Sequence, residues 1–156
     1  MTHPILNLDN IEFQDWGHGE RFAAKLGQVA ARIGASKLGY NVTILPAGKR
    51  AFPLHNHRVN EEMFFVLEGE GELRVGTGRH ALRRGDFVAC PPGGPELAHQ
   101  IVNTSATADL KYLSVSTMLA PEIVDYPDSG KTGVRLDRST RFLTRTGESL
   151  DYWEGE

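Results

Sequence analysis

The chain has 156 residues, the size of one domain, and its 40% hydrophobic and 24% charged residues are typical of a globular protein, not of a disordered or fibrous one. A net charge of -3 gives no general attraction to nucleic-acid phosphates or anionic lipid, so we expect a small-molecule partner, no nucleic acid and no membrane. Cys90 is the only cysteine, which excludes an intrachain disulfide, and residues 1–13 lack a basic segment followed by an apolar run, so we expect a cytoplasmic protein.

The first segment, residues 1–37, contains one stretch in which apolar residues recur at close to helical spacing, Glu20–Ile33. Gly27 interrupts this stretch, and a strand that leads into a barrel explains the pattern equally well. A helix and a strand therefore both remain open here.

Short apolar runs between glycine- and proline-rich breaks fill the middle of the chain, a pattern that predicts an all-β sandwich or barrel. The expected strands are Leu38–Leu45, Glu62–Leu67, Gly71–Val75, Phe87–Ala89, Ala98–Asn103 and Leu110–Thr117. Residues 118–156 are more polar and richer in turn residues, and we interpret them as a C-terminal arm. The chain is thus predicted to be one domain, 1–156, with a barrel core over about residues 38–117.

Two histidines in this core, His55 and His57, are separated by one residue. On an extended backbone, residues i and i+2 face the same way, so both imidazoles can reach one point. Glu62 follows after a gap that is long enough for a turn, and the next strand then returns alongside. Strand alternation shows that only one of Glu61 and Glu62 can face the histidines, without deciding which.

His99, in the predicted strand Ala98–Asn103, is the fourth candidate ligand and must approach from a neighbouring strand. Three imidazoles and one carboxylate suit a divalent transition metal, namely Zn, Mn, Fe, Ni or Co, and suit Ca or Mg poorly. We expect His3, His18 and His80 at the surface, because none of them has a second candidate ligand at a suitable spacing in the sequence.

These residues resemble the two motifs of the cupin superfamily. The first motif is matched, with one extra residue after its first glycine, by Gly48, His55, His57, Glu62 and Gly69. The six residues between Glu62 and Gly69 select Glu62 over Glu61. The second motif is matched, with five residues in place of two before its histidine, by Gly85, Pro91, Gly93, His99 and Asn103.

The resemblance implies the cupin double-stranded β-helix, a jelly-roll barrel of two antiparallel sheets, here with an N-terminal segment and a C-terminal arm. It also implies one divalent metal ion per chain, held by His55, His57, Glu62 and His99. Within the superfamily, the chain is similar to small single-domain bacterial cupins of the sugar-phosphate-isomerase-like type, in segments such as AHQIVN and YPDSGK. Cupins include isomerases, epimerases, dioxygenases, decarboxylases, storage proteins and sensor domains, so the resemblance does not fix the reaction.

We expect an enzyme of isomerase or epimerase type that acts on a small oxygenated or sugar-phosphate-like substrate, with the metal polarising a carbonyl or hydroxyl group. Lys49, Arg50 and Arg58 flank the histidine pair and are candidates for binding a phosphate or carboxylate, although basic residues on solvated loops explain them as well. Two alternatives stay open: an Fe(II) dioxygenase with the same ligands, and a metal-dependent binding or sensing module without turnover. No catalytic acid or base is assigned.

Three apolar residues, Met63, Phe65 and Leu67, alternate with the inward positions of the strand that begins at Glu62. An apolar outer face needs cover, which predicts a homodimer unless the N-terminal segment or the tail, with Tyr152 and Trp153, covers it. Elsewhere we expect Cys90 to be a small buried apolar residue, and residues 125–131, DYPDSGK, to form a tight turn with a positive φ at Gly130.

Overall fold

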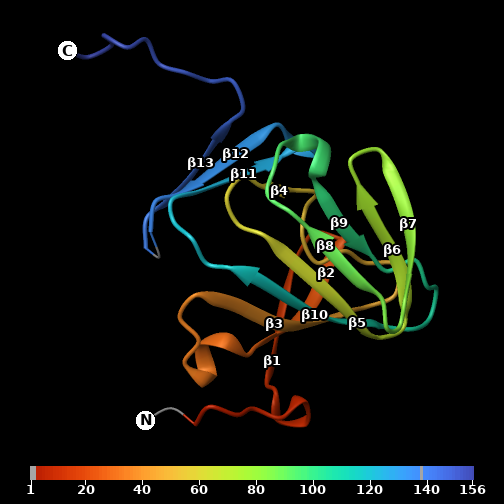
Figure 1. The fold of residues 1–156 in the computed structure, drawn as a ribbon. Helices are drawn as coiled ribbons and strands as arrows, with labels where there is room; N and C mark the ends of the chain where they lie inside the picture. Colours follow the sequence, from red (N-terminus) through yellow and green to blue (C-terminus); the bar gives the residue numbers. More distant parts are fainter. Residues whose placement is uncertain (1–2, 138) are drawn as a thin grey trace.

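The structure is a computed structural model that describes residues 3–137 and 139–156, and antiparallel β-strands are its main regular elements (Figure 1). The strands of the described chain are β1 (Phe13–His18), β2 (Phe22–Gln28), β3 (Leu38–Leu45), β4 (Asn56–His57), β5 (Glu62–Glu68), β6 (Glu70–Val75), β7 (Gly78–Arg83), β8 (Phe87–Cys90), β9 (His99–Val102), β10 (Leu110–Thr117), β11 (Glu122–Tyr126), β12 (Lys131–Arg135) and β13 (Arg141–Arg145). Short 3-10 helices lie at Leu8–Asn10, Ala30–Ile33, Pro95–Leu97 and Pro127–Ser129. None of the helices in the described ranges has the length and apolar character that crossing a bilayer requires.

The strands form a six-stranded sheet and two smaller ones, and neighbouring strands of the described chain pair antiparallel within them. The large sheet has the order β1-β2-β3-β10-β5-β8, and the smaller sheets have the orders β7-β6-β9 and β13-β12-β11-β4. An isolated bridge between His55 and His99 joins the two smaller sheets, so that they continue one another. The expected all-β jelly-roll barrel is confirmed, and the predicted strands β3 and β10 have the predicted bounds.

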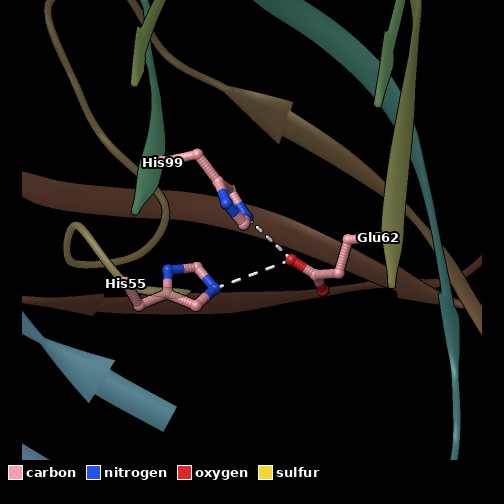
Figure 2. A group of neighbouring side chains, drawn as sticks. All are labelled: His55, Glu62 and His99. Atoms are coloured by element: carbon pink, nitrogen blue, oxygen red, sulfur yellow. Dashed lines mark hydrogen bonds and ion pairs between the residues drawn. The ribbon is translucent and has the colours of Figure 1, made fainter. Parts of the chain in front are cut away.

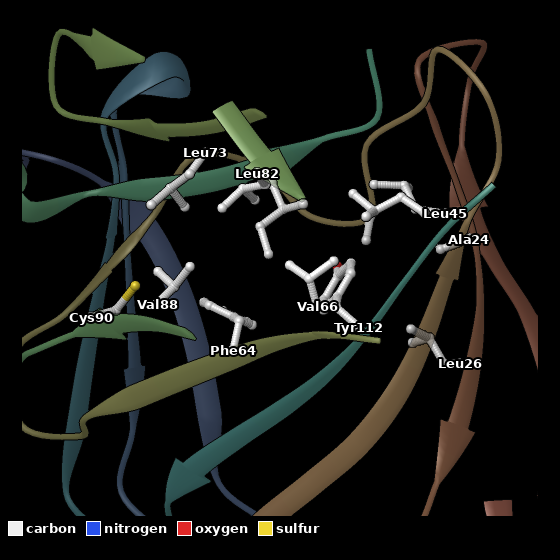
Figure 3. Close-up of a cluster of buried hydrophobic side chains, with 13 residues drawn as sticks. Ala24, Leu26, Leu45, Phe64, Val66, Leu73, Leu82, Val88, Cys90 and Tyr112 are labelled. Atoms are coloured by element: carbon white, nitrogen blue, oxygen red, sulfur yellow. The ribbon is translucent and has the colours of Figure 1, made fainter. Parts of the chain in front are cut away.

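The hydrophobic core lies between the large sheet and β6, β7 and β9 (Figure 3). Phe64, Val66 and Tyr112 of the large sheet pack there with Leu73 and Leu82. Strand β5 alternates as expected, because Phe64 and Val66 are buried while Met63, Phe65 and Leu67 are only half-buried. Burial of each large apolar side chain stabilises the barrel by about 1.5–3 kcal/mol. The alternation along β5 also places Glu62 on the inner face.

The stretch from Glu20 to Ile33 is a strand followed by a short turn of helix. Phe22–Gln28 forms β2, which pairs with both β1 and β3, and Ala30–Ile33 forms a 3-10 helix that ends at Gly34. The strand interpretation is thus correct and the helical one is wrong for most of the stretch. Pairing on both edges satisfies the backbone of β2 and outweighs the approximate helical spacing of its apolar residues.

The segment after residue 117 contains three strands that extend one of the smaller sheets. Strand β11 pairs with β4, and β12 and β13 follow outward, while residues 146–156 run away from the barrel (Figure 1). The expected turn within residues 125–131 is confirmed, since Pro127–Ser129 forms a 3-10 turn and Gly130 has φ +57°. The arm therefore lies next to β4, the strand that carries His57.

Candidate metal centre

The four predicted ligands come from different parts of the fold and meet at one carboxylate oxygen. Oε2 of Glu62, at the start of β5, lies 3.0 Å from Nε2 of His99, 3.4 Å from Nε2 of His57 and 3.7 Å from Nε2 of His55. His55, Glu62 and His99 form the tightest group, with ligand atoms all within 4.8 Å of one another (Figure 2). His57 stands beside this group, and its ring centroid lies 5.2 Å from that of His55.

Backbone carbonyl groups orient two of the imidazoles. Nδ1 of His55 lies 2.8 Å from the carbonyl oxygen of Pro53, and Nδ1 of His99 lies 3.4 Å from that of Leu97. A carbonyl oxygen only accepts hydrogen bonds, so Nδ1 is the nitrogen that donates and Nε2 keeps its lone pair. Ligating histidines in metalloproteins are held in this way by their second nitrogen.

The contact between His99 and Glu62 provides a test of whether a metal ion fits. With the proton of His99 on Nδ1, its Nε2 and the Oε2 of Glu62 are two acceptors only 3.0 Å apart. A cation that both atoms coordinate, or a second proton on the imidazole, removes this repulsion. Since three imidazole nitrogens and one carboxylate oxygen are the donor set that divalent transition metals prefer, the residues present fit such an ion.

Charge and burial act against each other at Glu62 and His57. Burial raises the pKa of the Glu62 carboxyl, but contacts with His55, His57 and His99 outweigh it and hold this pKa well below its usual range. Burial lowers the pKa of His57, but Glu62 and Glu122 outweigh it and raise this pKa above its ordinary value. The site therefore keeps an ionised carboxylate in a largely buried place, which favours a cation there.

Glu122, on β11, is a buried carboxylate that the sequence did not reveal as part of the site. It is 2% exposed, and its Oε2 lies 3.5 Å from Nδ1 of His57, an atom with no hydrogen-bond partner in the described chain. The backbone N–H groups of Arg58, Val59 and Asn60 all donate to this carboxylate. Because its partners are mostly backbone groups, no spacing of residue types could have pointed to it.

Comparison with protein families identifies the fold. The family model described as "Cupin domain" matches residues 41–116, which include all four predicted ligands. The chain belongs to the cupin superfamily.

Two solved structures resemble this cupin over nearly its whole length. A cupin-superfamily sugar phosphate isomerase of Silicibacter pomeroyi is 28% identical, with a TM-score of 0.81 over 96% of this chain and 98% of that one. A proposed sugar phosphate isomerase of Acidithiobacillus ferrooxidans is 23% identical, with a TM-score of 0.78 over 90% of this chain and 91% of that one, which shows the shared fold alone.

Among curated proteins, quercetin 2,3-dioxygenase of Bacillus subtilis is 35% identical over 82 residues. That match covers 51% of this cupin and 24% of the dioxygenase, so the similarity concerns one part of the longer protein.

The three basic residues expected near the substrate all have other contacts or lie elsewhere. Nζ of Lys49 donates to the carbonyl oxygen of Glu20 at 2.6 Å, and Nε of Arg58 donates to Asp125 at 2.8 Å. Arg50 lines a cavity of about 600 Å³ whose described lining contains none of the predicted metal ligands. Substrate binding by these residues stays a prediction.

A different cavity, of about 480 Å³, opens beside His57. It lies against the inner side of the C-terminal strands, and Glu122, Val124 and Tyr126 of β11 line it. The ring of Tyr126 also stacks on that of His55, with 6.2 Å between the centroids. The candidate metal centre thus borders a space large enough for a small organic molecule.

Proposed function

We propose that this cupin is an enzyme that uses one divalent transition metal ion, of the set Zn, Mn, Fe, Ni and Co, to act on a small oxygenated substrate of the sugar-phosphate type. The observation that carries the proposal is the convergence of three imidazole Nε2 atoms on Oε2 of Glu62. The similarity to the Silicibacter pomeroyi sugar phosphate isomerase over 96% of the chain supports an isomerase-type reaction.

In this proposal, His55, His57, Glu62 and His99 hold the metal. When bound, the metal supplies Lewis-acid polarisation of a substrate carbonyl or hydroxyl oxygen. The carbonyl groups of Pro53 and Leu97 keep two imidazoles in the ligating tautomer. His57 borders the cavity of about 480 Å³, so a substrate there reaches the centre from the side of the C-terminal strands.

A dioxygenase is the second candidate, supported by the 35% identity to quercetin 2,3-dioxygenase over 82 residues. The same ligand set serves Fe(II) chemistry, in which substrate and O2 occupy open coordination positions. Oxygen consumption by the iron-loaded protein, with no isomerisation under anaerobic conditions, would favour this candidate. Ligand binding without any turnover would instead indicate a binding or sensing module.

The test begins with the metal content of protein purified without an affinity tag. We expect about one metal ion per chain in the parent and almost none in a His55→Ala, His57→Ala double variant, because such sites retain metal through purification. His80→Ala, which removes an exposed histidine of β7, is the matched control and should retain the metal. Less than about 0.1 ion per chain in the parent under several metal supplements overturns the proposal. Substrate screening of the loaded protein then tests turnover.

We also propose that the protein is a homodimer through the outer face of the large sheet. Phe87, 74% exposed, packs on Phe65 with 4.4 Å between ring centroids, and Leu113 lies opposite Phe65 on β10. This row of apolar side chains crosses three neighbouring strands at the surface. A second copy of the same face would remove it from water.

A further inference from the structure

Two arginines share a face of the C-terminal sheet with His57. In the register of this sheet, His57 lies opposite Val124, and Glu122, two residues along β11, lies opposite Arg135, which in turn lies opposite Arg141. Residues directly opposite one another, or two apart on one strand, point to the same side of a sheet. Both arginines therefore face the side that His57 faces, and both line the same cavity of about 480 Å³.

The two guanidinium groups have no carboxylate partner within residues 3–137 and 139–156. The arginines of that part of the chain that do form ion pairs are Arg32, Arg58, Arg74, Arg79, Arg83 and Arg145. Arg135 instead donates to the carbonyl oxygen of Leu119 at 3.2 Å. The carboxylate of Glu122, although opposite Arg135, is occupied by the backbone N–H groups of residues 58–60. Like charges on directly opposed residues destabilise a sheet. An anion bound between the two guanidinium groups would replace their repulsion with attraction.

The face between His57 and the arginines carries apolar side chains. The row that starts at His57 continues through Val124 to Gly133. The side chains of Leu143 and Tyr126 lie over Gly133, at 3.3 Å and 3.6 Å from the position a Cβ would take there. With strands about 4.8 Å apart, Arg135 lies two strands and Arg141 three strands from His57, that is about 10 Å and 14 Å across the sheet. A short organic molecule with an anionic group at one end and an oxygen function at the other spans that interval.

We propose that Arg135 and Arg141 bind the phosphate group of a small phosphorylated substrate whose other end lies at the metal centre. The inference rests on the proposed function and assigns the residues that bind the phosphate group at the same site. Two adjacent guanidinium groups match a phosphate monoester better than a carboxylate, because the monoester carries close to two negative charges at neutral pH and offers three acceptor oxygens. The apolar side chains of Val124 and Leu143 in the cavity wall contact the carbon skeleton.

The experiment measures binding of inorganic phosphate to the metal-loaded full chain by calorimetry, with acetate as the competing anion class. We expect phosphate to bind more tightly than acetate, and its affinity to fall by about tenfold or more in an Arg135→Gln, Arg141→Gln double variant. Arg145→Gln is the matched control, because this arginine lies on β13 but is paired with Glu148. The phosphate affinity of this variant should equal that of the parent. Arg141→Gln alone, at an exposed position of the edge strand, serves as the test if the double variant does not fold.

Several results overturn the assignment. Phosphate that binds equally well without the arginines belongs to the metal or to another site, and acetate that binds as tightly as phosphate removes the phosphate specificity. A change in molecular mass of the double variant with unchanged phosphate affinity assigns the arginines to contacts between copies. Because phosphate affinity and metal content are measured without turnover, an inactive but metal-loaded parent that still binds phosphate through these arginines refutes only the proposed enzyme function.

Discussion

Glu122→Gln tests whether the buried carboxylate of β11 organises the site. Oε1 of Glu122 accepts from the N–H groups of Arg58 at 3.2 Å and Val59 at 3.1 Å, and Oε2 accepts from both the backbone and the side chain of Asn60. Glutamine replaces one of these oxygens with an NH2 group, which faces donors and cannot accept from them. If it replaces Oε2, two hydrogen bonds to a charged group are lost, each worth about 1.5–3 kcal/mol. We expect the free energy of unfolding to fall by about 3–6 kcal/mol, a large share of the total for a domain of this size.

Urea denaturation of the metal-free protein measures this loss, because metal removal excludes stabilisation by the bound ion. Glu61→Gln is the control: that side chain is exposed, and its substitution should change stability by less than about 0.5 kcal/mol. A loss below about 1 kcal/mol in Glu122→Gln would refute the reasoning. In the same variant, metal affinity measured against a chelator should fall about 10- to 100-fold, since Glu122 is the carboxylate that faces Nδ1 of His57.

Three further predictions concern other parts of the barrel. Burial raises the pKa of the Cys90 thiol to about 12, so the free energy of unfolding should decline as pH rises above the ordinary thiol pKa. A thiol reagent at pH 9 should label unfolded protein far faster than folded protein, and rapid labelling of the folded protein would contradict this. At Gly69, φ is +81° and an added Cβ would collide with the carbonyl group of Asp109, whereas at Gly48 φ is +73° and the space for a Cβ is open. Gly69→Ala should therefore lower the free energy of unfolding by at least about 1 kcal/mol more than Gly48→Ala. Equal losses in denaturation would show that the collision is relieved. Phe87→Glu should convert a dimer into a monomer in light scattering, and a monomeric parent at micromolar concentration would refute the proposed interface.

The barrel and the candidate ligands could be predicted because both depend on local, periodic signals. Alternation along β5 puts Glu62, Phe64 and Val66 on one face, and the structure buries Phe64 and Val66 there. Alternation alone does not choose between Glu61 and Glu62; the six residues between Glu62 and Gly69 in the cupin motif make that choice. The second motif departs from the cupin pattern by the extra residues before His99. The structure accommodates them in the 3-10 turn Pro95–Leu97, which Ala98 separates from β9. His99 consequently still reaches Oε2 of Glu62 at 3.0 Å.

The strands after residue 117 could not be predicted, for a physical reason. In β12 and β13 most side chains are exposed or half-buried, so no clean alternation of apolar and polar residues marks them. They are strands because pairing with β11, and through it with β4, satisfies their backbone groups. Such long-range pairing leaves no local trace in the sequence, and Glu122 and the arginine pair were missed for the same reason.

The predicted metal ligands and the groups around them come from two different parts of the chain. The family match ends at residue 116, so the predicted ligands all belong to the part of the chain that cupins share. The arm contributes the carboxylate behind His57, one wall of the adjoining cavity, and Arg135 and Arg141. Since cupins with similar ligand sets carry out different reactions, substrate choice must depend on what surrounds the metal. The resemblance to the Silicibacter pomeroyi isomerase extends over 96% of the chain and so includes most of the arm, which makes this segment the place to search for residues that determine specificity.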